Sequence, residues 1–243
     1  MLDKKDSMKI LIFNEYEKFE TKLIRKVIKK GDIVLDLGAM VGYYSVLFSQ
    51  LVGDNGRVIS FEPDPNNIPV LETNLEMNRC KNVTLEKKAV AAKSGKGQLF
   101  LCDKNLGMHR IYKSKYCGDS VDIDLVSLDD YFRDKARSID VIKLDLEGAE
   151  FGAIQGMRSV IEANERLVLF TEFVPCYIAE FGVQPKDYLS LLLDLGFTLY
   201  NINSKEQEVQ PLVLDTFLMI YTADKRKVAN LLCVKGEHLN VID

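Results

Sequence analysis

The chain has 243 residues, of which 47% are hydrophobic and 28% are charged, so it can bury a sizeable core as one globular domain spanning 1–243. Its formal net charge of −4 gives no electrostatic reason to expect a nucleic-acid partner. The first residues lack the apolar stretch of a secretory signal, and no apolar run is long enough to span a bilayer. We therefore expect a soluble, cytoplasmic protein.

Five cysteines are scattered along the chain, at Cys80, Cys102, Cys117, Cys176 and Cys233. No two of them are spaced as Cys-x-x-Cys, and no histidine lies beside them at a spacing typical of metal ligands. We expect reduced thiols, with neither a disulfide framework nor structural zinc.

The N-terminal third of the chain predicts strands that alternate with helices. Apolar residues at helical spacing predict an amphipathic helix at about 14–30, and Gly31 ends it. Residues 33–37 form an apolar, β-branched run that is typical of a buried strand, and a glycine turn and a helix follow it. A second strand is expected at 57–61, then another helix, and a third, weaker strand at 83–90.

The middle of the chain predicts a small β-hairpin. Residues 121–128 alternate between apolar and acidic side chains, which is the pattern of a half-exposed strand. This strand can pair antiparallel with 98–102, which leaves the polar residues 103–119 as a loop between them. A short helix follows at 128–132.

The C-terminal half predicts, in chain order, a strand at 139–144, a helix at 150–163, a strand at 167–170, a helix at 185–195, and strands at 197–202 and 216–222. The connection between the last two strands is too short for a helical crossover, so we expect an antiparallel hairpin. The result is an α/β core at about 32–223, with a mostly parallel sheet, and a C-terminal tail at 224–243.

Acidic residues recur where the predicted parallel strands end, at Asp36, Glu62, Asp145 and Glu172. The carboxyl ends of parallel strands share one edge of the sheet, which is where such folds bind ligands. Each acid alone could instead cap the N-terminus of a helix. Four acids at one edge favour a ligand site.

The turn after the first strand indicates which ligand this is. It has the pattern Asp36-x-Gly38-x-x-x-Gly42, and not the Gly-x-Gly-x-x-Gly of dinucleotide sites. A carboxylate at Asp36 would oppose a pyrophosphate, but it suits the ammonium and sulfonium groups of S-adenosylmethionine. Glu62 follows twenty residues after Gly42 and can accept hydrogen bonds from a ribose in either cofactor. An NAD-dependent oxidoreductase is therefore the disfavoured alternative.

Four segments together resemble the FkbM-type methyltransferases. They are residues 34–45 (VLDLGAMVGYYS), 61–64 (FEPD), 126–131 (VSLDDY) and 142–150 (IKLDLEGAE). The first two motifs alone indicate a class I methyltransferase, and the last narrows the resemblance to this family. The family's turn usually reads Gly-Ala-Asn, whereas position 40 is Met here.

The resemblance implies a Rossmann-like three-layer sandwich with a seven-stranded sheet, S-adenosylmethionine as methyl donor and S-adenosylhomocysteine as product. It also implies a hydroxyl acceptor on a sugar or another small molecule. A catalytically inactive S-adenosylmethionine-binding module is a further alternative, which Met40 alone supports. On this interpretation, the donor-binding residues are Asp36, Gly38, Ala39, Gly42, Tyr43, Ser45, Glu62, Pro63, Asp64, Ala89 and Asp145.

Methyl transfer needs an in-line arrangement of acceptor oxygen, methyl carbon and sulfur, and a group that removes the hydroxyl proton. Asp145, at the end of an apolar strand, is the first candidate near the methyl group, although it could instead cap a helix. His109 lies in the polar loop, and the ordinary pKa of histidine suits a base near neutrality; a surface histidine is the alternative.

The acceptor side is less defined by the sequence. Glu147, Glu150, Glu172 and Arg110 are candidate substrate residues, and the two glutamates after Asp145 could instead pair with Lys143 or Arg110. Several carboxylates at one edge could also bind Mg²⁺, but no dense cluster of metal ligands is visible, so no metal is predicted. The sequence leaves a homo-oligomer open.

Overall fold

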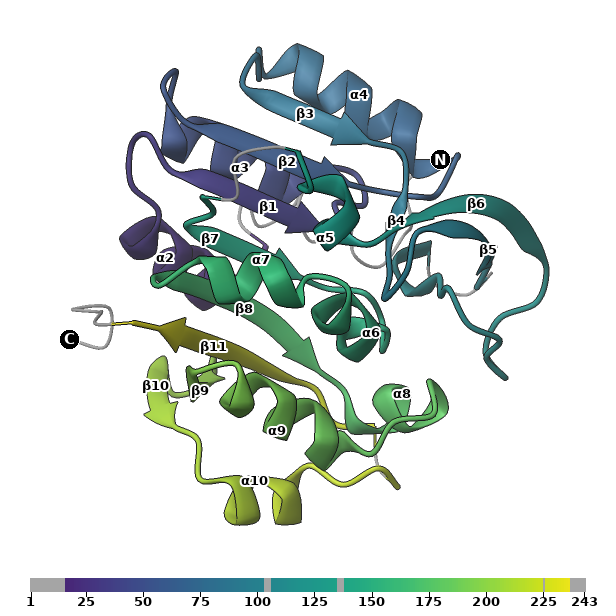
Figure 1. Ribbon diagram of the computed structural model, residues 1–243, viewed down its shortest axis with the longest axis vertical. Coiled ribbons are helices and arrows are strands. Elements are labelled where there is room, and N and C mark those ends of the chain that lie inside the picture. The colour runs from purple at the N-terminus through teal and green to yellow at the C-terminus, as the bar shows by residue number, and fades with distance from the viewer. Residues whose placement is uncertain (1–15, 103–105, 135–137, 225, 237–243) are drawn as a thin grey trace.

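The computed structural model describes residues 16–102, 106–134, 138–224 and 226–236 (Figure 1). Within these ranges, no helix is long and apolar enough to cross a membrane. Eight strands form the main sheet in the order β10-β9-β11-β8-β7-β1-β2-β3. Their bounds are β1 Ile33–Leu37, β2 Arg57–Phe61, β3 Val83–Glu86, β7 Val141–Leu144, β8 Leu167–Phe173, β9 Phe197–Asn203, β10 Glu208–Pro211 and β11 Ala229–Lys235.

The centre of this sheet is parallel, as the sequence predicts. β1 pairs in parallel with β2 and β7, β2 with β3, and β7 with β8. The arrowheads of β1, β3 and β8 all point to the right in Figure 1, so their carboxyl ends share one edge. In the register of β1 and β7, Asp36 lies opposite Lys143.

Helices cover both faces of the sheet. Their bounds are α2 Lys18–Val27, α3 Tyr43–Val52, α4 Asn67–Met77, α5 Leu128–Tyr131, α6 Glu150–Gln155, α7 Arg158–Ala163, α8 Pro175–Glu180, α9 Pro185–Asp194 and α10 Leu214–Ile220. Alternate residues of the central strands β1 and β7 enter two hydrophobic clusters. Leu35 and Ile142 belong to the cluster with α6, α7 and α9, whereas Val34 and Val141 belong to the cluster with α2 and α3. The fold is therefore the predicted three-layer α/β sandwich.

Two predictions for the C-terminal part are wrong. The main sheet has eight strands and not seven, and residues 216–222 fall largely in helix α10 instead of a strand. Only Phe217 of α10 is buried, while Met219 is 82% exposed, so the apolar run covers both the buried and the exposed side of a short helix.

Two strands run antiparallel to the rest of the sheet, β10 and β11, and β11 lies within the segment predicted as a tail. β11 pairs antiparallel with both β8 and β9, and its Leu231, Leu232 and Cys233 are fully buried. An apolar run between two strands gains hydrophobic burial on both faces, which explains its place inside the sheet. Residues 237–243 of the predicted tail lie outside the described residues.

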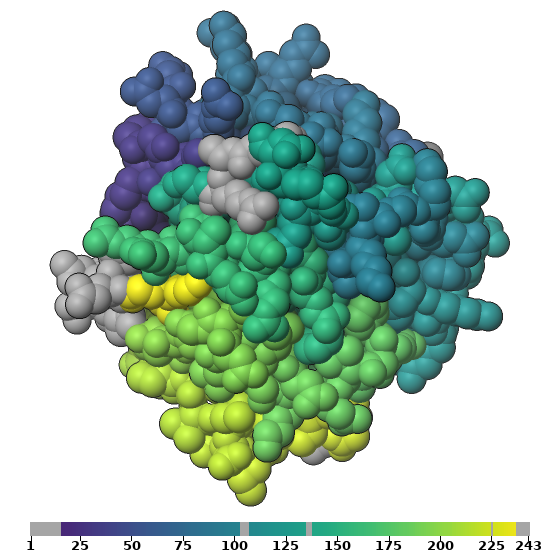
Figure 2. Space-filling model, in the orientation of Figure 1, coloured from purple at the N-terminus to yellow at the C-terminus, as the bar shows by residue number. Residues whose placement is uncertain are grey.

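A second sheet of three strands lies beyond the carboxyl ends of the main sheet. It contains β4 Ala89–Val90, β5 Gly95–Phe100 and β6 Ser120–Val126, in the order β4-β6-β5. β5 and β6 pair antiparallel, which confirms the predicted inserted hairpin. The predicted strand at 83–90 divides between the two sheets. The small sheet forms the projection on the right of Figure 2.

The prediction of reduced thiols is wrong for two of the five cysteines, because Cys102 and Cys117 form a disulfide. The antiparallel pairing continues past β5, where Leu101 and Asp119 lie opposite each other with a 2.7 Å backbone hydrogen bond. This pairing brings the Cα atoms of the two cysteines to 4.2 Å, although 15 positions separate them in the sequence. Cys80, Cys176 and Cys233 remain free.

Candidate active site

The glycine turn after β1 lies against the end of β7. Gly38 has a φ of +91°, and a Cβ atom there would lie 2.0 Å from the carbonyl oxygen of Asp145. Gly42 has a φ of +89° and precedes helix α3, and its Cβ would meet Leu71 at 2.2 Å. Both positions favour glycine because of their left-handed backbone conformation, and at Gly38 the backbone of Asp145 also leaves no space for a Cβ atom.

Met40, the departure from the usual family turn, contributes its backbone. Its φ is +49°, and its N–H donates a hydrogen bond to Oε2 of Glu62 at 2.7 Å. Asn adopts this left-handed conformation more readily than Met does, which gives a physical reason for Asn at this position.

A cavity of about 510 Å³ opens at the carboxyl ends of β1, β2, β7 and β8. The loop between β5 and β6 closes one side of it through Gly107, His109 and Ile111. The predicted site residues that line it are Asp36, Gly38, Ala39, Tyr43, Glu62, Pro63, Ala89, His109, Asp145, Glu147 and Glu172. Gly42, Ser45, Asp64, Arg110 and Glu150 do not line it.

Asp36 is fully buried and faces this cavity. Its Oδ2 accepts a hydrogen bond from the Ser45 hydroxyl at 2.6 Å, and that hydroxyl also lies 2.8 Å from Oγ of Ser60. Its Oδ1 has no hydrogen-bond partner within the described structure. Burial raises the pKa of Asp36, and the ammonium of Lys143 opposes this shift.

Lys143 is the cation at this end of the cavity. Its Nζ lies 3.0 Å from Oδ2 of Asp145 and 4.6 Å from the ring centroid of Tyr44. Burial alone would lower the pKa of Lys143, but the carboxylates of Asp145, Asp36 and Glu17 together raise it, so the side chain stays charged. From the sequence, Lys143 is considered only as a partner for glutamate. A lysine inside an apolar strand indicates a nearby carboxylate, since buried lysines are nearly always paired.

Glu17 also lines the cavity and was missed from the sequence. Its carboxylate accepts a hydrogen bond of 2.5 Å from the Tyr44 hydroxyl, and burial raises its pKa. It precedes helix α2 and reaches the site only because that helix packs beside α3. No local motif could have indicated this contact.

Glu62 organises the neighbouring turn. Besides Met40, it accepts hydrogen bonds from the backbone N–H of Asp64 at 2.9 Å and from the Asn67 side chain at 3.3 Å. Burial raises the pKa of Glu62 to about 7, although these hydrogen bonds favour the charged form. A carboxylate has about four acceptor positions, so three donors leave room for one more.

His109 is held at both ring nitrogens. Its Nδ1 accepts a hydrogen bond from the backbone N–H of Cys102 at 3.0 Å, and its Nε2 lies 3.2 Å from Oδ2 of Asp64. Burial would raise the pKa of Asp64, but the hydrogen bonds from His109 and Asn66 outweigh burial and lower it. The His109 side chain is only 8% exposed, so neither nitrogen is free to accept a proton from a ligand in this arrangement.

Three carboxylates converge beside Lys143. One oxygen each of Asp145, Glu147 and Glu172 lies within 4.8 Å of the others. Burial, together with the charges of Asp145 and Glu150, raises the pKa of Glu147 to about 8. Burial and the neighbouring carboxylates also raise the pKa of Glu172.

Glu150 and Arg110 lie behind the cavity wall. Glu150 is buried and accepts hydrogen bonds from the backbone N–H of Leu146 and of Gly148, so it shapes the turn before α6. Burial, which these hydrogen bonds oppose, raises its pKa to about 7.

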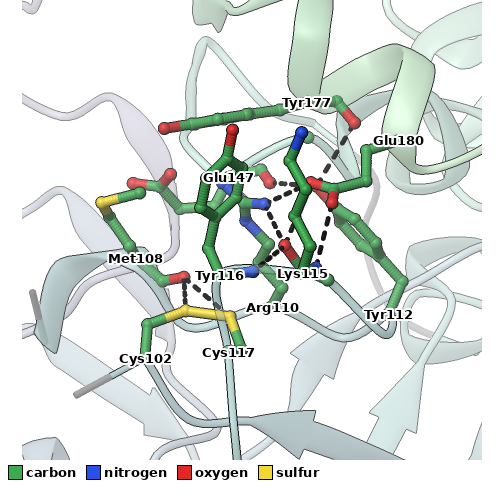
Figure 3. A network of polar contacts seen from close by, with 12 residues as sticks. Cys102, Met108, Arg110, Tyr112, Lys115, Tyr116, Cys117, Glu147, Tyr177 and Glu180 are labelled. Carbon is green, nitrogen blue, oxygen red and sulfur yellow. Dashed lines mark hydrogen bonds and ion pairs between the residues drawn. A yellow bond between two sulfur atoms is a disulfide. The ribbon is translucent and has the colours of Figure 1, made fainter. Parts of the chain in front are cut away.

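The Arg110 guanidinium is fully buried. Its Nη1 donates to Glu180 at 2.6 Å and to Ser114 at 2.7 Å, and its Cζ lies 3.8 Å from the ring centroid of Tyr177 (Figure 3). These contacts fasten the loop after the disulfide to helix α8. The sequence alone could not separate this role from a substrate contact, because it depends on how the loop folds back.

Comparison with known proteins agrees with this architecture. The model of the methyltransferase FkbM domain matches residues 36–199. Among curated proteins, none matches the chain significantly.

Three solved structures illustrate the similarity. A SAM-dependent O-methyltransferase from Thermotoga maritima is 12% identical with a TM-score of 0.51, and the match covers 96% of this chain and 71% of that one. A candidate methyltransferase from Streptococcus mutans, solved in complex with SAH, is 13% identical with a TM-score of 0.51 and coverages of 90% and 96%. A methyltransferase FkbM from Methylobacillus flagellatus KT is 18% identical with a TM-score of 0.49, and the match covers 84% of this chain but only 43% of that one.

At such low identities, the structural similarity shows the fold alone, which is that of Rossmann-like methyltransferases. The family model, in contrast, spans more than half of the chain and includes the glycine turn, Glu62 and the Asp145 motif. The chain therefore belongs to the methyltransferase FkbM domain family.

Proposed function

We propose that this protein transfers the methyl group of S-adenosylmethionine to a hydroxyl group of a small-molecule acceptor such as a carbohydrate. The observation that supports this most strongly is the unpartnered Oδ1 of Asp36, which is fully buried and faces the cavity. A buried carboxylate oxygen without a donor is unfavourable unless a ligand supplies one. The ammonium group of the methyl donor is such a ligand.

The neighbouring residues fit the rest of the donor. Glu62 retains an acceptor position toward the cavity for a ribose hydroxyl. Gly38 and Ala39 turn their backbone tightly at the end of β1, and both donate N–H groups to the carbonyl of Phe61 at 3.0 Å. The turn is thereby held open for a ligand that lies across the ends of β1 and β2.

The reaction forms an O–CH₃ bond to the acceptor and breaks the S–CH₃ bond of the donor, which leaves as S-adenosylhomocysteine. The protein positions the two reactants and assists removal of the hydroxyl proton. The carboxylates of Asp145, Glu147 and Glu172 border the acceptor side of the cavity.

His109 takes a positioning role in this proposal. Because both its ring nitrogens are engaged by Cys102 and Asp64, it connects the loop that closes the cavity to the end of β2. A base role for His109 would require that one of these contacts breaks first.

A titration of the purified protein with S-adenosylhomocysteine and, separately, with NADH tests the proposal. We expect one S-adenosylhomocysteine to bind per chain, and no NADH. Binding of NADH without binding of S-adenosylhomocysteine would instead support an oxidoreductase, which neither the family nor the glycine turn favours.

A further inference from the structure

The acidic residues at the ends of β7 and β8 form a compact, preorganised group. Asp145 follows β7 directly, Glu147 lies in the next turn, and Glu172 is within β8 near its carboxyl end. β7 and β8 are parallel neighbours, so these side chains meet at the same edge. One oxygen from each residue lies within 4.8 Å of the others, and all three residues line the cavity.

The protein supplies little positive charge to this group. Six carboxylate residues line the cavity, whereas the only lysines among its described lining residues are Lys88 and Lys143. Lys143 contacts one oxygen of Asp145 and also acts on Asp36 and Glu17. Among the described residues, no hydrogen bond or ion pair reaches the carboxylates of Glu147 and Glu172. The more distant guanidinium groups of Arg110 and Arg226 only partly offset the negative charge at Glu147.

A second observation is the hydroxyl of Tyr177, which lies close enough to Glu147 to feel its charge but does not line the cavity. The side chain belongs to helix α8, which follows directly after β8, and it is only 2% exposed. Its Oη has no hydrogen-bond partner within the described structure. The negative charge of Glu147 contributes, after burial, to raising the pKa of this hydroxyl. Figure 3 shows the Tyr177 hydroxyl and the Glu147 carboxylate extending to the same side of Arg110. A buried hydroxyl without a partner beside unpaired carboxylates indicates a missing polar ligand.

The spacing of the carboxylates suits one cation bound between them. Oxygen ligands lie about 2.3–2.6 Å from a Ca²⁺ ion, so any two of them are at most about 5 Å apart. The three carboxylate oxygens, which all lie within 4.8 Å of one another, meet this limit. A set of oxygen ligands alone favours Ca²⁺, Mg²⁺ and Mn²⁺ over the softer transition metals.

We propose that Asp145, Glu147 and Glu172 bind one hard divalent cation, and that this cation binds the acceptor hydroxyl. The proposal rests on the proposed function, and it makes methyl transfer depend on a divalent cation. The cation lowers the pKa of the bound hydroxyl. The O–H bond then breaks, its proton passes to water, and the oxygen attacks the methyl carbon, so the three carboxylates act as ligands in place of a base.

Binding of Mn²⁺ alone provides the test, followed by electron paramagnetic resonance of the free ion. We expect the wild-type protein to bind one Mn²⁺ per chain, and Ca²⁺ or Mg²⁺ to compete for it. Glu172→Gln and Glu147→Gln should each weaken Mn²⁺ binding at least ten-fold. Glu162→Gln is the matched control, because Glu162 is 54% exposed and paired only with Arg158, and it should bind Mn²⁺ like the wild type.

Each result has a defined meaning. No uptake of Mn²⁺ by the wild type, or equal uptake by Glu172→Gln and Glu162→Gln, would overturn the proposed cation site. A parallel titration with S-adenosylhomocysteine separates this outcome from failure of the proposed function. If the wild type binds S-adenosylhomocysteine but not Mn²⁺, only the cation site is refuted. Retained binding of S-adenosylhomocysteine by Glu147→Gln and Glu172→Gln shows that these variants are folded.

Discussion

The backbone N–H of Met40 donates a 2.7 Å hydrogen bond to Oε2 of Glu62, which joins the glycine turn after β1 to the end of β2. Met40 must adopt a φ of +49° to make this bond. The position that departs from the usual family turn therefore contributes through its backbone N–H, at a conformational cost.

Replacing Met40 with asparagine should relieve part of this cost. The left-handed conformation costs an ordinary residue about 1–2 kcal/mol, and Asn tolerates it better. We expect Met40→Asn to raise the free energy of unfolding by about 1 kcal/mol in urea denaturation. The matched control is Met219→Asn, at an 82% exposed position in α10, which should give no gain. A loss of stability in Met40→Asn would contradict this account of the turn.

The buried carboxylate of Glu62 should make stability depend on pH. Burial raises its pKa to about 7 in the folded protein, from an ordinary value of 4.5, so the folded state holds this proton more tightly. The stabilisation is complete below the ordinary pKa and disappears as the pH rises through about 7. Relative to Glu62→Gln, the wild type should lose on the order of 3 kcal/mol between pH 4 and pH 8. A stability difference between the two proteins that stays constant over this range would refute the raised pKa.

The charge of Lys143 should be required for a stable site. Lys143→Met leaves Asp36 and Asp145 without their shared cation, and breaking a buried ion pair by removing one partner costs about 3–5 kcal/mol. We expect the free energy of unfolding, measured by urea denaturation, to fall by about 3 kcal/mol. This is near the lower end of the range because Asp145 is 36% exposed and water screens part of the interaction. Lys96→Met is the control, since Lys96 is 83% exposed and pairs only at the surface with Asp124. Equal losses in the two variants would show that the ion pair at Lys143 is not important.

The disulfide predicts a definite thiol count. Two of the five cysteines are paired, so the unfolded, non-reduced protein should expose three thiols, and five after reduction. A disulfide that closes a loop of about 15 residues stabilises a protein by about 3 kcal/mol, so reduction or Cys117→Ser should lower the free energy of unfolding by roughly this amount. Cys80→Ser, which removes a free thiol, should leave it unchanged. Five thiols before reduction would exclude the disulfide.

Local patterns predicted the parts of this structure in which neighbouring residues carry the information. Burial on both faces gave the apolar run that predicted the strand at Ile33–Leu37, and the left-handed turn after it was predicted by its glycines. Burial on one face gave the period-two pattern that predicted β6 Ser120–Val126.

Features that depend on contacts distant in the sequence were missed or misassigned. β11 resembled a tail because its burial comes from β8 and β9, and Cys102 meets Cys117 only through the extended pairing of β5 and β6. Glu17 reaches the cavity through helix packing, and the contacts that occupy both nitrogens of His109 come from two separate segments. Residue type indicated that Asp36 and Glu62 line a ligand site, but it could not show which oxygen atoms remain free.

The affinity of Asp36→Asn for S-adenosylhomocysteine, measured by isothermal titration calorimetry, tests the central claim most directly. Asn preserves the shape of the side chain and removes the charge that faces the donor's ammonium group. We expect one S-adenosylhomocysteine per wild-type chain, binding at least ten-fold weaker in Asp36→Asn, and unchanged binding in the exposed control Asp122→Asn. Equal affinity in all three proteins would contradict the assignment of Asp36 to the donor site, and absence of binding to the wild type would contradict the proposed function.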